Sequence, residues 1–197
     1  MSFKRVYILR GVPGSGKSTY IEKISKSLDD QFPMDIQVCS ADHFFESCDC
    51  DIEHMRLANY TDYKEMKKII REQHNRECIR PKTYKFDFNK LGAAHQACQD
   101  KYIKLLESPE SAIIFVDNTN LSVKELKFYV GHAIGINTPE NQIVYKIVNV
   151  RADIDKIVGR NIHGVPEEKV RQMYARMRHG DEELAKLDWI QEDHYSG

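Results

Sequence analysis

The segment from Val6 to Thr19 constrains the fold of this chain more than any other part of its sequence. A short apolar run, Val6–Leu9, leads into the residues GVPGSGKST at Gly11–Thr19, which match the spacing G-x-x-x-x-G-K-[ST]. This spacing is typical of a strand, a glycine-rich loop that curls around a phosphate, and a helix that begins near the lysine. The segment therefore predicts a phosphate-binding loop at the end of a buried first strand.

Each group in this loop has a defined role in phosphate binding. Backbone amides in the loop and at the helix start point at the phosphates, and the helix dipole adds positive potential. Lys17 is expected to reach the β- and γ-phosphates, and the hydroxyl of Ser18 is expected to bind Mg²⁺. The expected ATP-binding residues of the loop are Gly11, Pro13, Gly14, Ser15, Gly16, Lys17, Ser18 and Thr19. ATP and Mg²⁺ are the cofactors that this motif predicts.

Composition narrows the class of protein. At 197 residues the chain fits one domain, and its formal net charge of -1 gives no overall attraction to a polyanion. A nucleic-acid substrate would therefore need a local basic patch. The five cysteines form no C-x-x-C pair, the N-terminal residues do not read as a signal peptide, and no apolar stretch reaches membrane-spanning length. These features predict an intracellular, cytoplasmic protein without a membrane partner, and a nuclear location stays open.

Strand and helix signals alternate along the chain, which predicts a parallel sheet between helices. The expected strands are Val6–Arg10, Ile36–Cys39, Ala112–Val116 and Ile143–Val150, and the expected helices are Lys17–Leu28, Asn89–Glu107 and a segment from Ser122 to about Ile134, closed by Gly135. The fold class expected is an α/β P-loop NTPase three-layer sandwich, with about four strands in the order 2-3-1-4. A helical insertion at about 47–85 and lid helices at about 151–180 would complete this single domain.

Two polar segments follow predicted strands, where functional residues of open parallel sheets gather. The second strand leads into Ser40–Phe45, and the third leads into Asp117–Asn120. Asp117 stands where a Walker B acid would hold Mg²⁺, directly or through water. Asp42 is a candidate base for the proton of an attacking hydroxyl. Helix capping or turn formation is the alternative role for either aspartate.

Four motifs together resemble the P-loop polynucleotide kinases of the phage 5′-hydroxyl kinase type. They are the loop Gly11–Thr19, the run Ser40–Phe45, the run D-N-T-N-L at Asp117–Leu121 and the run R-N-I-H-G-V-P at Arg160–Pro166. The chain looks closer still to related cellular kinase-like domains, some of which occur in ubiquitin-ligase-binding proteins. A weaker match covers Leu91–Cys98. The resemblance extends over most of the chain except about 47–85.

The resemblance implies transfer of the ATP γ-phosphate to a hydroxyl, above all the 5′-OH of RNA or DNA. In that interpretation Asp42 matches the general base, Asp117 matches the acid that supports the metal, and Arg160 belongs to the lid that closes on the nucleotide. Lys17 and Arg160 would place positive charge on the transferred phosphoryl group. The residues expected to contact the acceptor are Asp42, His43, Asn118 and Asn120.

This chain also departs from the phage pattern. Phe45 stands where the phage type has a basic residue that contacts the phosphate beside the target nucleotide, and the lid offers His163 in place of a further arginine. Two alternatives to a polynucleotide kinase therefore stay open. One is a kinase for a small acceptor such as a nucleoside or sugar, and the other is an ATP-binding NTPase module that acts through a protein partner.

The two remaining segments allow a functional and a structural interpretation. In the insertion, a helix from Thr61 to Arg71 would either meet a nucleic-acid backbone or pack as a solvated amphipathic helix on the sheet edge. Aromatic residues that could stack on bases there are Tyr60, Tyr84 and Phe86. Near the C-terminus, the spacing of Met173 and Met177 predicts an inward face. Arg171, Arg176 and Arg178 would touch phosphates or solvent, and a last helix is expected after Gly180.

Overall fold

The computed structural model describes residues 1–29, 34–47, 83–160 and 165–196. The chain divides into two compact units, one formed by Met1–Ala41 with His95–Gly197 and the other by Asp42–Ala94. The expected helix at 61–71, Tyr60 and the lid residue His163 lie outside the described residues.

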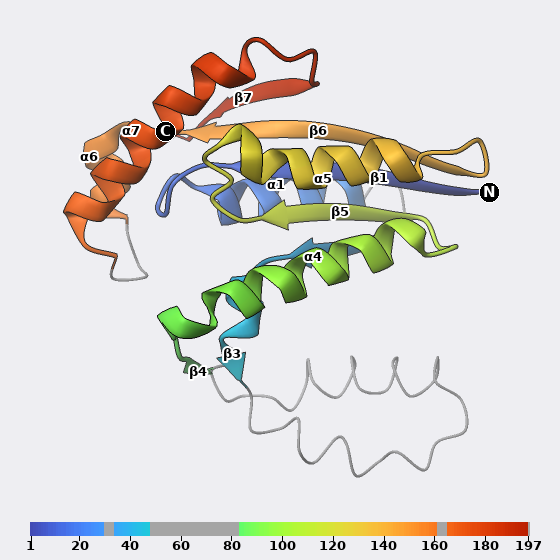
Figure 1. Ribbon diagram of the computed structural model, residues 1–197, viewed down its shortest axis with the longest axis horizontal. Helices are drawn as coiled ribbons and strands as arrows, with labels where there is room; N and C mark the ends of the chain where they lie inside the picture. Colours follow the sequence, from blue (N-terminus) through green and yellow to red (C-terminus); the bar gives the residue numbers. More distant parts are fainter. Residues whose placement is uncertain (30–33, 48–82, 161–164, 197) are drawn as a thin grey trace. The chain divides into compact units, whose positions relative to one another are not determined.

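The first unit is built on a five-stranded parallel sheet (Figure 1). Its strands are β1 (Ser2–Arg10), β2 (Asp35–Cys39), β5 (Ala112–Asp117), β6 (Asn141–Arg151) and β7 (Gln191–Tyr195). They lie in the order β2-β5-β1-β6-β7, and every neighbouring pair is parallel. The four predicted strands thus take the predicted order 2-3-1-4, and β7 extends the sheet beyond β6.

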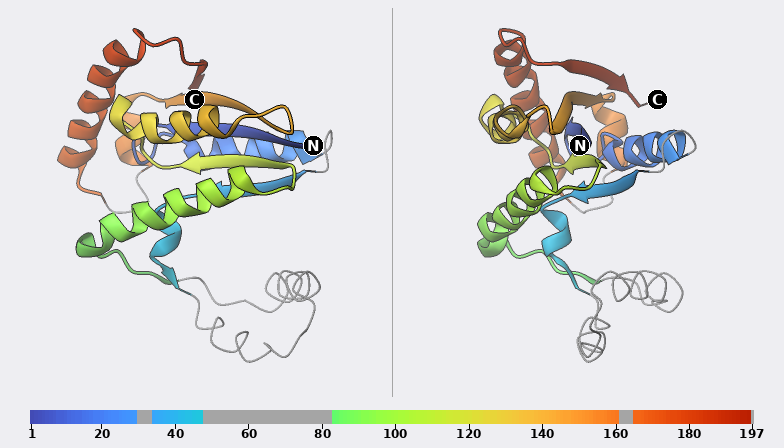
Figure 2. Two further views of the ribbon diagram at one scale, coloured as in Figure 1. Left: turned by 45° about the vertical axis from the view of Figure 1, so that its right-hand side comes forward. Right: turned by 90° about the vertical axis from the view of Figure 1, so that its right-hand side faces the viewer.

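Helices cover both faces of this sheet, as two further views show (Figure 2). Alternate residues of the strands face α1 (Lys17–Asp29) on one side, where Leu9 and Phe115 pack with Tyr20. On the other side lie α4 (Leu91–Glu107) and α5 (Val123–Ile136). The two helices are joined where the Tyr102 hydroxyl donates to the carbonyl of Tyr129 over 2.9 Å. Burial of the central strands on both faces explains their apolar sequences.

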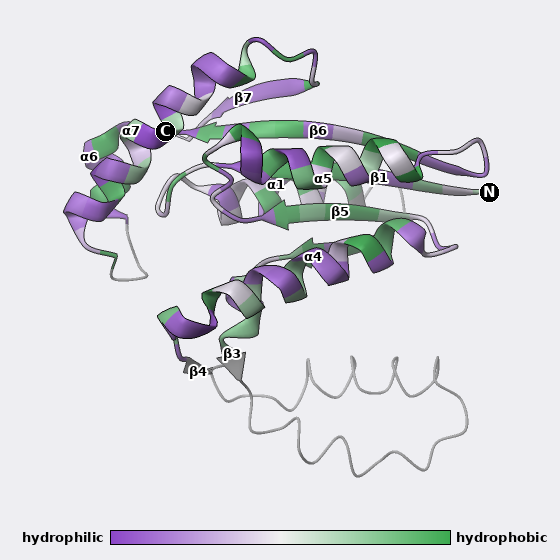
Figure 3. Ribbon diagram, viewed as in Figure 1, coloured by the Kyte–Doolittle hydropathy of each residue, from purple (hydrophilic) through white to green (hydrophobic). Residues whose placement is uncertain are grey.

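The prediction of a last helix after Gly180 is wrong, because the last described element is a strand. Helix α7 (Glu167–Leu184) runs through Gly180, and β7 follows it. Figure 3 shows β7 as hydrophilic where β5 is hydrophobic, so no apolar pattern marks it. Ion pairs of Glu192 with Lys146 (2.6 Å) and of Asp193 with Arg151 (3.0 Å) accompany its pairing with β6. Backbone pairing with β6 and the contact of the His194 ring with Tyr20 (4.9 Å between ring centres) therefore hold this edge strand, and the exposed ion pairs add little.

Local signals explain where the helices begin. A capping box between Ser122 and Glu125 starts α5, which passes through the expected stop at Gly135 and ends at Ile136. Two helices occupy the expected lid region: α6 (Ile154–Gly159), capped by Asp153, and α7. Met177 of α7 is buried and Met173 is partly buried, which confirms the expected inward face. Of the helices in the described ranges, none is long and apolar enough to cross a membrane.

The second unit contains short elements around one backbone pairing. A 3-10 turn η1 (Asp42–Phe44) leads into β3 (Glu46–Ser47), which pairs antiparallel with β4 (Thr83–Tyr84). A second 3-10 turn, η3 (Phe88–Lys90), leads into α4. The pairing of β3 with β4 brings the two described ends of this unit together.

Candidate functional site

The loop Gly11–Thr19 follows β1 at the carboxyl edge of the sheet, and its shape depends on glycine at two positions. Gly14 and Gly16 have φ values of +83° and +98°, a region that side-chain-bearing residues rarely adopt. A Cβ atom at Gly14 would also lie 2.5 Å from the carbonyl oxygen of Ile157. At Gly16 it would lie 2.9 Å from the hydroxyl of Ser196.

The side chain of Lys17 bends back over this loop. Its Nζ donates to the carbonyl oxygens of Gly11 (3.1 Å) and Val12 (3.3 Å). Helix α1 begins at Lys17, so its first-turn amides have no intrahelical acceptor and carry the positive end of the helix dipole. Ser18 and Thr19 lie exposed in this first turn. The buried hydroxyl of Ser15 has no hydrogen-bond partner among the described residues.

The turn after β5 is bound directly to the start of the phosphate loop. Gly11 donates its backbone N–H to the carbonyl of Thr119 over 3.0 Å. The Asn120 amide donates to the carbonyl of Leu9 over 2.7 Å, and Asn120 itself has a φ of +47°. Asp117, the last residue of β5, pairs with Leu9 in the strand register. The structure therefore brings the predicted metal-supporting acid to the same edge as the loop.

Asn118 lies at the centre of a buried polar network. Its Oδ1 accepts the backbone N–H of Ala41 over 3.0 Å, and its Nδ2 lies 3.1 Å from the Tyr129 hydroxyl and 3.3 Å from the Cys98 sulfur. Burial raises the pKa of Cys98, although hydrogen bonds from Asn118 and Tyr129 lower it in part. Burial also raises the pKa of Tyr129, so both groups are neutral near pH 7. The network ties the end of β5 to the residue that precedes Asp42.

These contacts bear on two of the expected acceptor-binding residues. The side chains of Asn118 and Asn120 are buried, with only 8% and 4% of each residue exposed, and both bond to the backbone of a neighbouring strand or its continuation. This favours a structural role for both asparagines over direct contact with an acceptor. Asn residues at such positions satisfy backbone groups that no strand partner reaches.

Ser196 links the loop to the expected lid arginine. Its backbone N–H donates to the Arg151 carbonyl over 2.8 Å, continuing the pairing of β7 with β6. Its hydroxyl donates to the carbonyl of Ser15 over 2.8 Å and accepts from Arg160 over 3.3 Å. Arg160, exposed at the end of α6, is therefore brought to the phosphate loop through Ser196. Sequence reasoning missed Ser196, because only the position of β7 reveals it.

A buried ion-pair network lies beneath the loop. Arg10, the last residue of β1, is fully buried and donates to Asp181 (2.5 Å) and to the carbonyls of Leu121 (3.1 Å) and Met177 (2.6 Å). Arg151 donates to the same carboxylate over 3.0 Å. Burial alone would raise the pKa of Asp181, but hydrogen bonds from Arg151 and Arg10 outweigh it and place that pKa below its usual value. A charged residue that ends an apolar strand was the sequence signal for this network.

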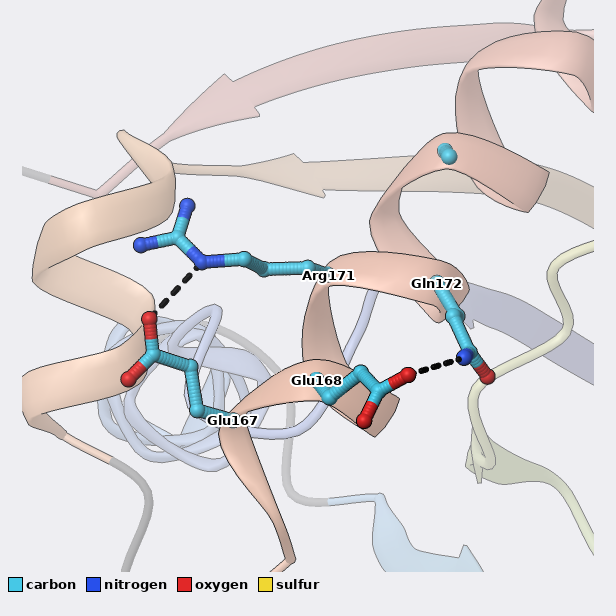
Figure 4. A pocket seen from close by; sticks show the side chains of 5 residues that line it. Glu167, Glu168, Arg171 and Gln172 are labelled. Carbon is cyan, nitrogen blue, oxygen red and sulfur yellow. Dashed lines mark hydrogen bonds and ion pairs between the residues drawn. The ribbon is translucent and has the colours of Figure 1, made fainter.

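Two arginines of α7 that were expected to meet phosphates or solvent form ion pairs with acidic side chains. Arg171 pairs with Glu167 (2.8 Å) and Asp155 (3.0 Å), and Arg176 pairs with Glu125 (2.7 Å). Figure 4 shows the hollow at the start of α7, lined by Glu167, Glu168, Arg171, Gln172 and Ala175. These pairs neutralise much of the basic face of α7.

Asp42 and His43 belong to the second unit and both are exposed. They form the 3-10 turn η1, in which the backbone N–H of Phe45 donates to the Asp42 carbonyl over 2.9 Å. The role of Asp42 as general base and the acceptor contact of His43 remain predictions.

The oxygen groups at the loop fit a magnesium ion that enters with a nucleotide. Within the described ranges, no group of three or more His, Cys, Asp or Glu side chains could hold a metal by itself. The Ser18 hydroxyl and the Asp117 carboxylate are hard oxygen ligands. Mg²⁺ typically takes one or two such ligands together with substrate phosphates and water.

No protein-family model matches the chain. It is 28% identical over 172 residues to NEDD4-binding protein 2 of Homo sapiens, a match that covers 84% of this chain and 7% of that protein. Among solved structures, Kti12 of Chaetomium thermophilum in complex with ADP-AlF3 aligns with a TM-score of 0.51 and 13% identity, covering 98% of this chain and 88% of that one. A shikimate kinase of Aquifex aeolicus aligns with a TM-score of 0.44 and 14% identity, covering 96% of this chain and 85% of that one. The sheet order, the phosphate loop and the likeness to Kti12 show that the chain has an α/β P-loop NTPase fold.

Proposed function

We propose that this protein is an ATP- and Mg²⁺-dependent kinase that transfers the γ-phosphate to a hydroxyl, the 5′-OH of RNA or DNA. The observation that carries this proposal is the phosphate loop itself, with two glycines at positive φ and Lys17 bent over it. The solved neighbour Kti12 holds ADP-AlF3, which supports nucleotide binding in a fold of this kind. The motifs D-N-T-N-L and R-N-I-H-G-V-P support a polynucleotide acceptor.

Bound ATP would take over donors that the loop now satisfies internally. Lys17 donates to two carbonyls of its own loop, and the β- and γ-phosphate oxygens would offer it stronger, charged acceptors. The unpartnered hydroxyl of Ser15 and the first amides of α1 supply further donors at the same place. Ser18 and Asp117 would hold Mg²⁺, which neutralises charge on the phosphates.

In the proposed transfer, the acceptor oxygen forms a bond to the γ-phosphorus while the bond to the β–γ bridging oxygen breaks, and ADP leaves. Asp42 accepts the proton of the attacking hydroxyl. Lys17 and Arg160 place positive charge against the equatorial oxygens, where negative charge gathers in the transition state. For Arg160 this requires its guanidinium to move from Ser196 to the phosphate.

A second candidate function is supported by the named relative. The name of NEDD4-binding protein 2 states that this relative binds another protein, and the match covers only 7% of its length. An ATP-binding NTPase module that acts through a protein partner is therefore the rival proposal. A kinase for a nucleoside or sugar is the third, because Phe45 replaces a phosphate-contacting basic residue of the phage type.

The test is transfer of labelled γ-phosphate from ATP, with Mg²⁺, to 5′-OH RNA and DNA oligonucleotides and to a panel of nucleosides and sugars. Asp42→Asn should lower the transfer rate by about 10²–10⁴ with little change in ATP affinity, because a general base contributes that much. Asp100→Asn, an exposed acid on α4, is the matched control and should leave the rate unchanged. If only nucleosides or sugars are labelled, the acceptor is a small molecule and not a polynucleotide. ATP binding without any labelled acceptor would favour the partner-dependent module.

A further inference from the structure

The second unit carries three exposed phenylalanine side chains. Phe44, Phe86 and Phe88 are 45%, 54% and 76% exposed. Phe44 and Phe86, which contact the same buried ring, are here called the aromatic cluster. Phenylalanine is normally buried, and exposed apolar residues that lie close together mark binding surfaces. Neither the phosphate loop nor the proposed role of Asp42 explains why this part of the chain presents three phenylalanines to solvent.

One buried ring organises two of these three side chains. Phe45 is only 5% exposed, and its ring centre lies 5.5 Å from that of Phe44 and 5.2 Å from that of Phe86. The Lys85 backbone N–H donates to the Phe45 carbonyl over 3.0 Å, next to the pairing of β3 with β4. Phe44 and Phe86 come from distant parts of the sequence and are held against the same ring. They therefore form a defined surface rather than two independent mobile side chains.

The position of Phe44 ties this surface to the proposed chemistry. Phe44 and Asp42 are the two ends of the same 3-10 turn, η1. If Asp42 accepts the proton of a 5′-hydroxyl, the sugar that carries the hydroxyl lies at this turn. The base attached to that sugar then lies within reach of side chains from the same turn.

Acids and lysines both lie near the cluster, and the lysines can pair with a phosphate backbone. The acids of this unit include Asp42 and Glu46. Lys85 and Lys90 are exposed, each within two residues of Phe86 or Phe88 in the sequence. Asp87 offsets part of this charge, because it lies 4.0 Å from Lys90 and accepts from the Asn89 backbone to cap η3. Aromatic rings with nearby cations are how proteins bind single-stranded nucleic acids of any sequence.

We propose that Phe44 and Phe86 form a stacking surface for the first unpaired base, or bases, at the 5′ end of a single-stranded nucleic acid. This inference rests on the proposed polynucleotide kinase function and deepens it. Because the last base of a blunt duplex is paired and stacked on its neighbour, freeing it costs a few kcal/mol, so the surface favours single-stranded ends over blunt duplex ends. Because every base has an aromatic face, it confers little sequence preference.

The experiment compares wild type with Phe44→Ala and Phe86→Ala on single-stranded 5′-OH oligonucleotides of about twelve nucleotides. One set ends in an ordinary nucleotide and a matched set has an abasic 5′-terminal nucleotide. Binding is measured by fluorescence anisotropy of a 3′-labelled oligonucleotide without ATP, and transfer is measured as KM and kcat for both substrates. Ile134→Ala, which removes a 57% exposed apolar side chain from α5, is the matched control.

Each phenylalanine variant should bind the ordinary oligonucleotide roughly 5- to 100-fold more weakly, the range expected for one lost stacking contact. KM for the oligonucleotide should rise in parallel, while KM for ATP and kcat stay near wild type. The abasic end should weaken wild-type binding by a similar factor and add little to the variants. Phe44→Tyr should keep most of the affinity, which separates stacking from a folding defect.

Two results would overturn the stacking surface. The first is wild-type affinity in both alanine variants, and the second is an equal loss on ordinary and abasic ends. If wild type transfers phosphate to oligonucleotides and the alanine variants do so equally well, the stacking surface is wrong but the proposed kinase function stands. Wild type that neither binds nor labels an oligonucleotide would remove the proposed acceptor as well.

Discussion

Two segments follow neighbouring strands of the same sheet and meet at its carboxyl edge, yet they use their residues in opposite ways. In the phosphate loop Gly11–Thr19, which follows β1, the groups expected to bind phosphate are mainly backbone amides, and two glycines at positive φ set the path of that backbone. Its surrounding side chains, such as Ser196 and Arg10, hold the loop or its base in place. In the turn Asp117–Asn120, which follows β5, the two asparagine side chains bond to backbone and are buried.

The difference shows that a polar motif in a sequence does not by itself predict contact with a ligand. Glycine positions report backbone conformation directly, because only glycine adopts φ values near +83° and +98° without strain. An asparagine reports only that a hydrogen bond is made, not whether its partner is a ligand or the protein's own backbone. Asn118 illustrates this, since its amide oxygen accepts from Ala41 inside the protein.

Disrupting the ion pairs of Asp181 with Arg10 and Arg151, beneath the phosphate loop, should have the largest effect on stability. Asp181→Asn removes the charge that Arg10 and Arg151 share, and breaking a buried pair costs about 3–5 kcal/mol. We expect the lower end, because the Asp181 side chain is 25% exposed. The pKa of this carboxyl is lowered in the folded protein, so its contribution is present above the ordinary value of about 3.9 and is lost as pH falls through the folded value.

Urea unfolding of wild type and Asp181→Asn at a series of pH values measures this. The difference in the free energy of unfolding should be full at pH 7 and shrink below about pH 4. Glu192→Gln, which breaks the exposed pair with Lys146, is the control and should change stability by about 0.5 kcal/mol or less. A difference between wild type and Asp181→Asn that does not change with pH would contradict the electrostatic account.

Gly14→Ala tests whether the loop depends on its backbone. A side chain at positive φ costs about 1–2 kcal/mol, and the new Cβ would meet the Ile157 carbonyl at 2.5 Å. We expect Mg²⁺–ATP affinity to fall by about tenfold or more, measured by calorimetry. Gly131→Ala in α5, where no atom beyond the adjoining residues and the helix's own backbone lies within 4 Å of the new Cβ, is the control and should stabilise the protein by about 0.5–1 kcal/mol. Equal ATP affinity in both variants would refute this view of the loop.

Asn118→Ala separates a structural asparagine from one that contacts an acceptor. The substitution leaves the Ala41 N–H without its hydrogen-bond partner and removes the contacts with Tyr129 and Cys98. We therefore expect the free energy of unfolding to fall by about 2 kcal/mol. Tyr129→Phe, which removes one hydroxyl of the network, should lose about 1 kcal/mol. Denaturant unfolding checks both values. A raised KM for the acceptor at unchanged stability would instead support the sequence-based expectation.

The smallest effect concerns Asn120, which combines a φ of +47° with a bond to the Leu9 carbonyl. Both Asn120→Gly and Asn120→Ala lose that bond, but only alanine also strains the backbone. Alanine should therefore be less stable than glycine by about 1 kcal/mol, read from their denaturation midpoints. Equal stability would show that the turn relaxes once the side chain is gone.

Much of the fold could be predicted because its signals are local. The four central strands are apolar runs buried on both faces, and their alternation with helices predicts a parallel sheet. The order of the strands is the one that the resemblance to P-loop kinases implies. The capping box formed by Ser122 and Glu125 marks the start of α5. The strand β7 could not be predicted in this way, because its sequence QEDHY has no apolar alternation and its pairing partner lies in β6.

By itself the sequence determined the phosphate loop, since the spacing of glycines and lysine specifies a backbone path whatever surrounds it. It also determined which residue types stand at the carboxyl edge of the sheet. Only the tertiary structure decided where those side chains turn: Asn118 and Asn120 inward, Ser196 onto the loop, and Arg10 against Asp181. The physical reason is that a hydrogen-bonding group takes the partner that folding brings near, and that partner is distant in the sequence.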